Sequence, residues 1–333
     1  MSVSAVVVTY ATGPALTRCL DSLAGEVDEV VVVDNAEGGP EIDDARGREG
    51  VRIVIPGENL GFAAGANLGA RNATGETLAF LNPDTVAAPG AVRQLEQTLT
   101  DPTIGIAMAR LRLLDRPELL NSRGTEVHVS GIGWAAGYGE PAQSLDTLRD
   151  VAAPSGAAMA VRAETFQRLG GFAEELFMYL EDLELGWRAR LAGLRVVVDP
   201  EADVYHEYEF DRHSKKSYYV ERNRLVFCLT GYSTKLLLLL APVLVAAELG
   251  VVGLALKEGW VRDKLSGWSW CLGNVGVIRR RRQSTQALRA VSDRELAGFL
   301  TPIFSPGMLP VPALLRAANP VVAGYWGLVR RAL

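Results

Sequence analysis

Short apolar runs alternate with amphipathic segments over the first third of the chain. Four runs read SAVVVTY, EVVVVD, RIVIP and TLAFLNPD, and each is rich in β-branched or aromatic residues. Between the first two runs, residues 16–23 carry apolar side chains at helical spacing. Strand-like runs that alternate with helical segments are typical of α/β proteins. We therefore predict an α/β fold with a mainly parallel central sheet.

Polar side chains follow the predicted strands at their carboxyl ends. Residues 30–33 and 78–81 are uninterrupted apolar runs, as expected for strands that are covered on both faces. The polar residues at the strand ends are Thr9, Asp34, Asn82 and Asp84. In open α/β sheets, ligands bind outside these ends. We therefore expect a ligand-binding edge at this side of the sheet.

The chain changes character twice after the first third. From residue 104 to 200, Gly-rich connections lead to a strand-like run, RVVVD, which we expect to complete the same sheet as an acceptor-side subdomain. Farther on come an apolar run over residues 236–256 and four consecutive arginines at 279–282. We predict an α/β domain over residues 1–225 and a separate helical module, apolar and basic, over residues 226–333.

The composition excludes several classes of protein. The net charge of −5 argues against a nucleic-acid-binding protein, because a surface that tracks phosphates needs a basic excess. The three cysteines lie far apart, without the spacing of a zinc site or a disulfide framework, so we expect the reducing cytosol. The N-terminus lacks the basic and apolar regions of a signal peptide and is interpreted as the first strand.

Asp84 is the first candidate for chemistry. It follows a buried strand in the sequence FLNPD, where a carboxylate can bind a hard divalent cation such as Mg²⁺ or Mn²⁺. Such a cation would neutralise a diphosphate leaving group. The alternative is a simple turn, because Asn-Pro and Pro-Asp are common turn formers and Asp84 is suited to cap a following helix.

Two further segments suit a nucleotide. Asp34 ends a strand, where its carboxylate can bond a nucleobase or ribose; the alternative is a turn or a helix cap. The small residues of 59–69, NLGFAAGANLG, allow close approach to an anion at a helix start, or tight helix packing. This stretch is neither GxGxxG nor a P-loop, which argues against a dehydrogenase.

Three carboxylates, Glu181, Asp182 and Glu184, lie within four positions. On a helix, Glu181 and Glu184 share a face while Asp182 points elsewhere, and one of the three suits a general base. The alternative is an acidic, solvated helix start. His206 follows another strand and suits a nitrogen ligand for a metal, or a structural role.

Taken together and in order, these motifs resemble glycosyltransferase family 2, and within it the bacterial rhamnosyltransferase-like enzymes. The motifs are VVVTY, VVVDN, NLGFAAGANLG, FLNPD, SGAAMAVR, and GGF with MYLEDLELGWRARLAG, followed by a histidine. The resemblance covers residues 3–225. It implies a GT-A, Rossmann-like fold, a nucleotide diphosphate sugar donor, and inversion at the anomeric carbon by single displacement.

The resemblance also implies roles for individual residues. Asp182 would be the catalytic base, and the Asp84-bound cation, with His206 as second ligand, would stabilise the departing diphosphate. Glu181 and Arg188 would orient the helix of the base. The implied donor-binding residues are Thr9, Tyr10, Asp34, Asn59, Asn67, Asn82 and Asp84.

Two positions depart from the family pattern. Asn82 stands where many relatives have the first aspartate of a DxD motif, which leaves one carboxylate fewer for the metal. Ala173 replaces the acid that is usual in a GGFDE turn.

The run over residues 236–256 is long enough to cross a bilayer, but Pro242 and Glu248 interrupt it. We expect a helix or helical pair that lies in the membrane interface or packs within a homo-oligomer, and a true span is the alternative. Trp260, Trp268 and Trp270, with the arginines at 279–282, suit anionic headgroups or a polyprenyl diphosphate; the alternative is a solvated helix at an oligomer interface. We expect a peripheral or monotopic protein at the cytoplasmic face of the cell membrane.

The expected acceptor is a glycan on undecaprenyl or decaprenyl diphosphate, or a growing cell-surface polysaccharide. By family likeness the first donor is dTDP-L-rhamnose, followed by UDP-galactofuranose, UDP-hexoses and GDP-mannose. Two other functions compete. A nucleotidyltransferase needs a Gly-rich basic loop near the N-terminus, yet residues 10–16 hold no Lys or Arg. A non-catalytic glycan-binding or assembly module is made conceivable by Asn82 and the apolar tail.

Overall fold

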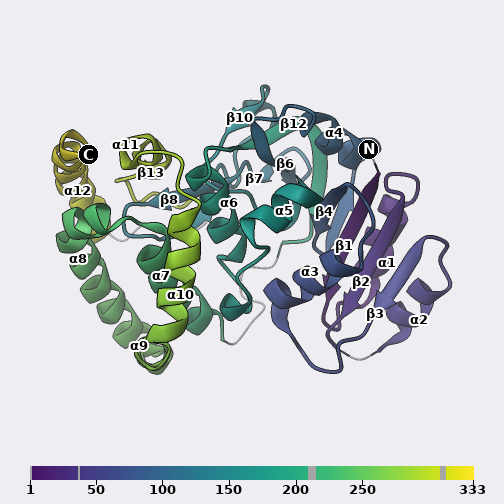
Figure 1. Ribbon diagram of the computed structural model, residues 1–333, viewed down its shortest axis with the longest axis horizontal. Helices are drawn as coiled ribbons and strands as arrows, with labels where there is room; N and C mark the ends of the chain where they lie inside the picture. The colour runs from purple at the N-terminus through teal and green to yellow at the C-terminus, as the bar shows by residue number, and fades with distance from the viewer. Residues whose placement is uncertain (1, 37, 209–214, 308–312) are drawn as a thin grey trace.

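The computed structural model describes residues 2–36, 38–208, 215–307 and 313–333, and its centre is a mixed sheet of ten strands (Figure 1). The main path runs β10-β12-β6-β11-β4-β1-β2-β3, with β5 beside β12 and β7 beside β6. Neighbours among β1 to β4 are parallel, as are β6 and β12, whereas β11 runs antiparallel between β4 and β6. The strands are β1 (Val3–Thr9), β2 (Glu29–Asp34), β3 (Val51–Val54), β4 (Thr77–Leu81), β5 (Thr85–Ala87), β6 (Ile104–Leu113), β7 (Leu120–Ser122), β10 (Arg149–Asp150), β11 (Ala158–Arg162) and β12 (Arg195–His206).

Burial explains the uninterrupted apolar runs. Every residue of β1 and β4 is buried, and so is every residue of β2 after Glu29. Helices pack along these strands and along the rest of the sheet, and the valine-rich sequences fit a core that is covered on both faces. The helices are α1 (Pro14–Leu23), α2 (Pro40–Arg46), α3 (Gly61–Asn72), α4 (Ala91–Thr98), α5 (Ala163–Leu169) and α6 (Glu181–Leu191). The predicted fold class is confirmed.

The glycines of α3 serve helix packing. A Cβ at Gly69 would lie 2.4 Å from Val6 Cγ1, and one at Gly65 would lie 2.9 Å from Val8 Cγ1. The helix axis therefore lies closer to β1 than any side chain at these positions would allow. The tight-packing alternative is the correct one for these two residues.

The predicted acceptor-side subdomain completes the same sheet, as expected. Strands β6, β11 and β12 extend it beyond β4. The twelve-residue strand β12 pairs with β6 through two irregularities, and its last residues pair with the short strand β5, which places His206 opposite Thr85. The far end of β12 is thereby brought to the carboxyl end of β4.

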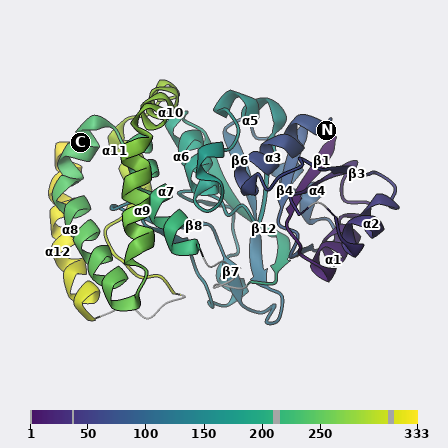
Figure 2. The same cartoon turned by 90° about the horizontal axis from the view of Figure 1, so that it is seen from below.

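The C-terminal helices gather on the side of the molecule away from β1 to β3 (Figures 1 and 2). A second sheet, β13-β8-β9, joins this part to the centre of the chain. Helix α7 runs through residue 225, so it belongs to both predicted parts. The bounds are α7 (Lys216–Gly231), α8 (Thr234–Glu258), α9 (Val261–Gly273), α10 (Val275–Ala287), α11 (Asp293–Leu296), α12 (Ala313–Ala332), β8 (Thr125–His128), β9 (Gly133–Ala135) and β13 (Leu300–Thr301).

The apolar run forms one continuous helix, α8, with Pro242 inside it. Among the described residues, α8 alone has the length and apolar composition that crossing a membrane would require. The sequence suggested that Glu248 interrupts this run, but the helix continues through it. The Glu248 carboxylate forms ion pairs with Arg224 of α7 and, at 2.9 Å, with Lys264 of α9, and both cations are buried. Glu248 therefore faces the protein and fixes α8 to its neighbours.

The four arginines at 279–282 divide into two kinds. Arg281 forms an ion pair with Glu175 at 2.6 Å, and Arg282 donates to the carbonyl oxygen of Tyr232 at 2.8 Å. Arg279 and Arg280 are exposed. Half of the predicted basic cluster is thus used to attach α10 to the rest of the molecule.

Candidate active site

Asp84 and His206 face each other at the edge where β4 ends. His206 Nε2 lies 3.3 Å from Asp84 Oδ1, and both side chains are largely buried. The pairing of β5 with β12 creates this proximity, because Thr85 is the register partner of His206 and the carbonyl of Asp84 accepts the amide hydrogen of Glu207. The two residues predicted as metal ligands are therefore brought together.

Asn121 orients the imidazole from the other side. Its Oδ1 lies 3.0 Å from His206 Nδ1, and Asn121 is buried on β7. When Nδ1–H donates to this oxygen, the lone pair of the neutral ring lies on Nε2, the atom that faces Asp84. Such a partner beyond the ligand is typical of histidines that bind metals.

The donor set fits a divalent cation that also binds a substrate. Two ligands at right angles, each about 2.1 Å from Mg²⁺, are themselves about 3 Å apart, which is close to the spacing of Asp84 and His206. No group of three or more His, Cys, Asp or Glu side chains is arranged to hold a metal within the described ranges. One carboxylate and one imidazole suit an ion whose other ligands are water and phosphate oxygens.

Asp182 is the first-turn carboxylate of α6 that is held by main-chain amides. Its Oδ2 accepts the N–H of Gly156 and its Oδ1 accepts that of Leu183, each at 2.7 Å. The residue after Gly156, Ala157, accepts the amide hydrogen of Asn82 at 3.0 Å. Two consecutive residues therefore link the two sites: Gly156 binds Asp182, and Ala157 binds Asn82 at the strand end that carries Asp84.

The surroundings of Asp182 favour a base. Burial raises the pKa of Asp182 above its ordinary value, while the bonds from Gly156 and Leu183 oppose that rise. Burial raises the pKa of Glu181 well above its usual range, and the charge of Asp182 adds to the effect. A carboxylate with a raised pKa binds a proton more readily, as a base that deprotonates a hydroxyl requires. The alternative of a solvated acidic helix start does not hold for Glu181, which is 6% exposed, or for the buried Glu184.

A strained loop leads into α6. Phe177, Tyr179 and Leu180 have φ values of 65°, 67° and 64°, in the left-handed region that favours glycine. Each such residue costs about 1 kcal/mol or more, and such backbone is concentrated at functional sites. The strain lies immediately before Glu181 and Asp182.

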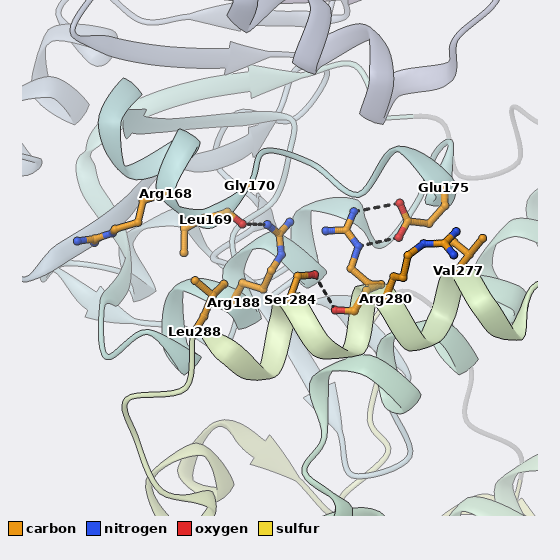
Figure 3. Close-up of a pocket in the computed structure, with 10 residues that line it drawn as sticks. Arg168, Leu169, Gly170, Glu175, Arg188, Val277, Arg280, Ser284 and Leu288 are labelled. Carbon is orange, nitrogen blue, oxygen red and sulfur yellow. Dashed lines mark hydrogen bonds and ion pairs between the residues drawn. The ribbon is translucent and has the colours of Figure 1, made fainter.

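Arg188 ties α6 to the turn that follows α5. Its guanidinium binds Glu184 and donates to the carbonyl oxygens of Leu169 and, at 2.6 Å, of Gly171. Figure 3 shows this side chain reaching the turn at Leu169. The same arginine lines a cavity of about 530 Å³ beside α10. None of the predicted catalytic or metal-binding side chains lines this cavity. Arg188 therefore anchors α6 to that turn, and its supporting role in catalysis stays a prediction.

The nucleoside-side candidates lie around the ends of β1 and β2. Thr9 is buried and its hydroxyl lies 2.7 Å from that of Thr12, whereas Tyr10 is 57% exposed. Asp34 accepts the amide hydrogens of Ala36 at 3.0 Å and Gly38 at 2.6 Å. The turn that was the alternative for Asp34 is therefore present, and nucleoside contact by these residues stays a prediction.

The asparagines of the donor-side segment differ in their bonding. Asn59 is exposed and its Oδ1 accepts the amide hydrogen of Gly61 at the start of α3. Both amide hydrogens of Asn67 are used, by the carbonyl oxygen of Phe172 at 2.9 Å and by Glu174 at 3.0 Å. These bonds connect α3 to the turn after α5, and the donor contact that we expected from Asn67 stays a prediction.

Three residues near the site carried no clear signal in the sequence. Asn121 lies on a short strand outside every motif, and Gly156 was seen only as part of the SGAAMAVR motif. Asn35 donates to the carbonyl oxygen of Gly61 at 3.1 Å and so fixes the start of α3, although VVVDN named it only as a motif letter. Tertiary pairing, rather than a local pattern, gives these residues their place.

Comparison with known proteins finds matches over the part of the chain that carries these residues. The model of the family described as glycosyltransferase-like family 2 matches residues 2–227. The chain is 31% identical over 231 residues to N-acetylglucosaminyl-diphospho-decaprenol L-rhamnosyltransferase of Mycobacterium tuberculosis, a match that covers 60% of this chain and 74% of the relative.

Solved structures share the fold. The crystal structure of GalNAc-T7 with UDP, GalNAc and Mn²⁺ superposes with a TM-score of 0.57 at 17% identity, covering 69% of this chain and 48% of that one. TarS 1-349 of S. aureus in complex with UDP-GlcNAc gives a TM-score of 0.55 at 15% identity, covering 100% and 91%. At these identities the likeness establishes the fold alone.

Proposed function

The chain belongs to glycosyltransferase family 2, and from that membership we propose that it transfers L-rhamnose from dTDP-L-rhamnose to a polyprenyl-diphosphate-linked or growing cell-surface glycan. The transferase activity follows from the family. The sugar, the acceptor and the roles of single residues are the proposal. The named relative that acts on decaprenol-linked N-acetylglucosamine supports the choice of rhamnose and of a lipid-linked acceptor.

One relationship carries the mechanism. Gly156 binds Asp182, and its neighbour Ala157 binds Asn82, two residues before Asp84. The proposed base and the proposed cation ligands therefore stand at the same edge of the sheet, on two sides of one short segment. A donor whose diphosphate lies at Asp84 would present its sugar toward Asp182.

The reaction we propose is a single displacement. Asp182 accepts the proton of an acceptor hydroxyl as that oxygen forms a bond to the anomeric carbon. The bond from the anomeric carbon to the diphosphate oxygen breaks, and the nucleoside diphosphate leaves from the opposite face, so the configuration inverts. Asp84 and His206 would hold Mg²⁺ or Mn²⁺, which supplies positive charge to the leaving diphosphate when bound. The Mn²⁺ in the GalNAc-T7 structure supports a divalent ion.

A donor panel tests the sugar. The purified protein is incubated with N-acetylglucosaminyl-diphospho-polyprenol in detergent, Mn²⁺ or Mg²⁺, and one of four donor types: dTDP-L-rhamnose, UDP-galactofuranose, UDP-hexoses or GDP-mannose. We expect transfer to be fastest from dTDP-L-rhamnose. Faster transfer from another donor would replace rhamnose while leaving the transferase intact, and transfer from none would contradict the proposed acceptor.

We propose that the protein associates with the cytoplasmic face of the membrane through α8, as a peripheral or monotopic protein. Leu238, Val245 and Leu249 are 72%, 59% and 69% exposed on this helix. A helix that keeps such side chains in water would gain by entering an interface, and the exposed Arg279 and Arg280 suit anionic headgroups. Contact between two copies through the same helices is the competing explanation.

Flotation of the full chain with anionic vesicles tests this association. Replacing Leu238, Val245 and Leu249 with serine should abolish flotation. The matched control replaces two exposed apolar residues outside the C-terminal helices, Ile55 after β3 and Leu148 before β10, which should leave flotation unchanged. Unchanged flotation of the α8 variant would count against the proposal, and a change only in oligomeric state would favour the competing explanation.

A further inference from the structure

Helix α7 holds the strained loop before α6 through one buried amide. Asn223 is completely buried, and its Nδ2 lies 2.9 Å from the carbonyl oxygens of Leu176 and Met178 and 2.7 Å from that of Tyr179. Its two hydrogens are shared among these three oxygens. One side chain thus satisfies the inward-facing carbonyls of a loop that lacks the regular hydrogen bonds of a helix or strand.

Arg222 reinforces the same contact. Its guanidinium donates to the carbonyl oxygens of Glu175 at 3.0 Å and Leu176 at 2.7 Å. It also donates to Asn223 Oδ1 at 2.8 Å, which fixes the orientation of that amide. The ring of Trp270 packs against the guanidinium, with its centre 4.7 Å away. The two side chains therefore form a rigid pair on the loop.

The outer side of the loop touches the donor-side helix. The carbonyl oxygen of Phe177 accepts the amide hydrogen of Ala63 at 3.0 Å, and a Cβ at Gly61 would lie 2.6 Å from the ring of Phe177. At its end the loop continues through Leu180 into α6, where Asp182 is the second residue. One loop therefore connects the start of α3 to the proposed base.

We propose that Asn223 and Arg222 are positioning residues that set the place of Asp182 relative to α3 without touching the substrates. The proposal rests on the proposed function and adds two residues to it. Without the donors from α7, the carbonyl oxygens of Met178 and Tyr179 would lose the amide that binds them, and that of Leu176 would keep only the amide hydrogen of Met178, so the left-handed loop would relax to another conformation. The first turn of α6 would move with it.

Three variants of the full chain test this inference. Asn223→Ala removes the shared donor, and Arg222→Lys keeps the charge while losing the planar group that reaches two carbonyls. Thr230→Val is the matched control, because Thr230 is equally buried on α7 and its hydroxyl bonds only to carbonyl oxygens of its own helix. The readouts are kcat and donor KM, and amide hydrogen exchange over residues 176–183.

We expect Asn223→Ala to lower kcat by about 10²-fold, the loss typical of a reacting group displaced by about 1 Å, with little change in donor KM. Exchange over residues 176–183 should accelerate. Arg222→Lys should show the same two effects more weakly, and it decides the matter if Asn223→Ala does not fold. Thr230→Val should behave as the wild type.

Normal kcat and normal exchange in a folded variant would overturn the inference, and so would a loss confined to donor KM. The exchange measurement needs no substrate. A wild-type chain that transfers no sugar would therefore contradict the proposed function while the role of Asn223 in holding the loop is still tested.

Discussion

The amide of Gly156 lies 2.7 Å from Asp182 Oδ2, and this contact joins the start of β11 to the first turn of α6. Because β11 also pairs with β4, this contact fixes the position of Asp182, the proposed base, relative to the strand whose end carries Asp84. Replacement of Asp182 with Asn keeps the shape of the side chain but removes the basic oxygen. Asp182→Asn should lower transfer by about 10²–10⁴-fold, the usual contribution of a general base.

Donor binding should largely survive in Asp182→Asn, because the proposed donor contacts lie elsewhere. Isothermal calorimetry with the donor and Mn²⁺ measures this separately from turnover. Near-normal turnover of the variant would contradict the assignment of Asp182 as the base.

Metal dependence should respond to Asn121 as well as to His206. Asn121→Ala frees the imidazole to rotate, and loss of a partner of this kind typically weakens metal binding by about 10-fold or more. The Mn²⁺ concentration for half-maximal activity should therefore rise in Asn121→Ala and further in His206→Ala. Asn72→Ala is the control, because Asn72 caps the last turn of α3 by bonding to Leu68. An unchanged Mn²⁺ requirement in both site variants would exclude His206 as a ligand.

His128 should make stability depend on pH. Burial lowers the pKa of His128 from 6.5 to about 4, and its ring is bonded to Ser130 and to the carbonyl oxygen of Pro302. As the pH falls below 6.5, His128 becomes protonated in the unfolded chain, whereas in the folded chain it is protonated only near pH 4. The contribution of His128 to the unfolding free energy is therefore complete above pH 6.5 and is lost between pH 6.5 and pH 4.

Between pH 7 and pH 5, the wild type should lose about 2 kcal/mol more unfolding free energy than His128→Asn. Urea unfolding at the two pH values measures the difference. Equal losses in the two proteins would mean that His128 takes up its proton in the folded state at its ordinary pKa.

Glu248 should matter for stability although it lies in an apolar helix. Burial opposes its ionisation, yet the charges of Arg224 and Lys264 hold the pKa of Glu248 below its ordinary value. Glu248→Ala should cost about 3 kcal/mol, the low end for a broken buried pair, because Glu221 still binds both cations. Glu258→Gln, exposed on the same helix, is the control and should change stability by no more than about 0.5 kcal/mol in urea unfolding. If Glu248→Ala lowered the unfolding free energy no more than Glu258→Gln, the ion pairs of Glu248 would contribute nothing to stability.

The sequence predicted most of what depends on local pattern. Strand ends with polar residues led to Asp84 and His206, and the structure places their side chains 3.3 Å apart. The acidic segment led to Asp182 at a helix start. Periodicity and strand ends suffice for such residues because their place follows from the element on which they stand.

What could not be predicted depends on pairing across the chain. Asn121 reaches His206 only because β7 and β12 both pair with β6. The backbone strain at Phe177 could not be predicted, because a phenylalanine in the sequence gives no indication of a positive φ. Glu248 looked like a defect in an apolar run because its partners stand on two other helices. In each case the deciding contact lies outside any window of neighbouring residues.

Four consecutive residues of α7 bind two different parts of the molecule. Arg222 and Asn223 hold the strained loop before α6, whereas Glu221 and Arg224 bind Lys264 and Glu248 in the C-terminal helices. Recombination between relatives is therefore constrained. A chimaera that exchanges the C-terminal helices has to bring α7 with them, and the loop that α7 holds has to come from the same parent.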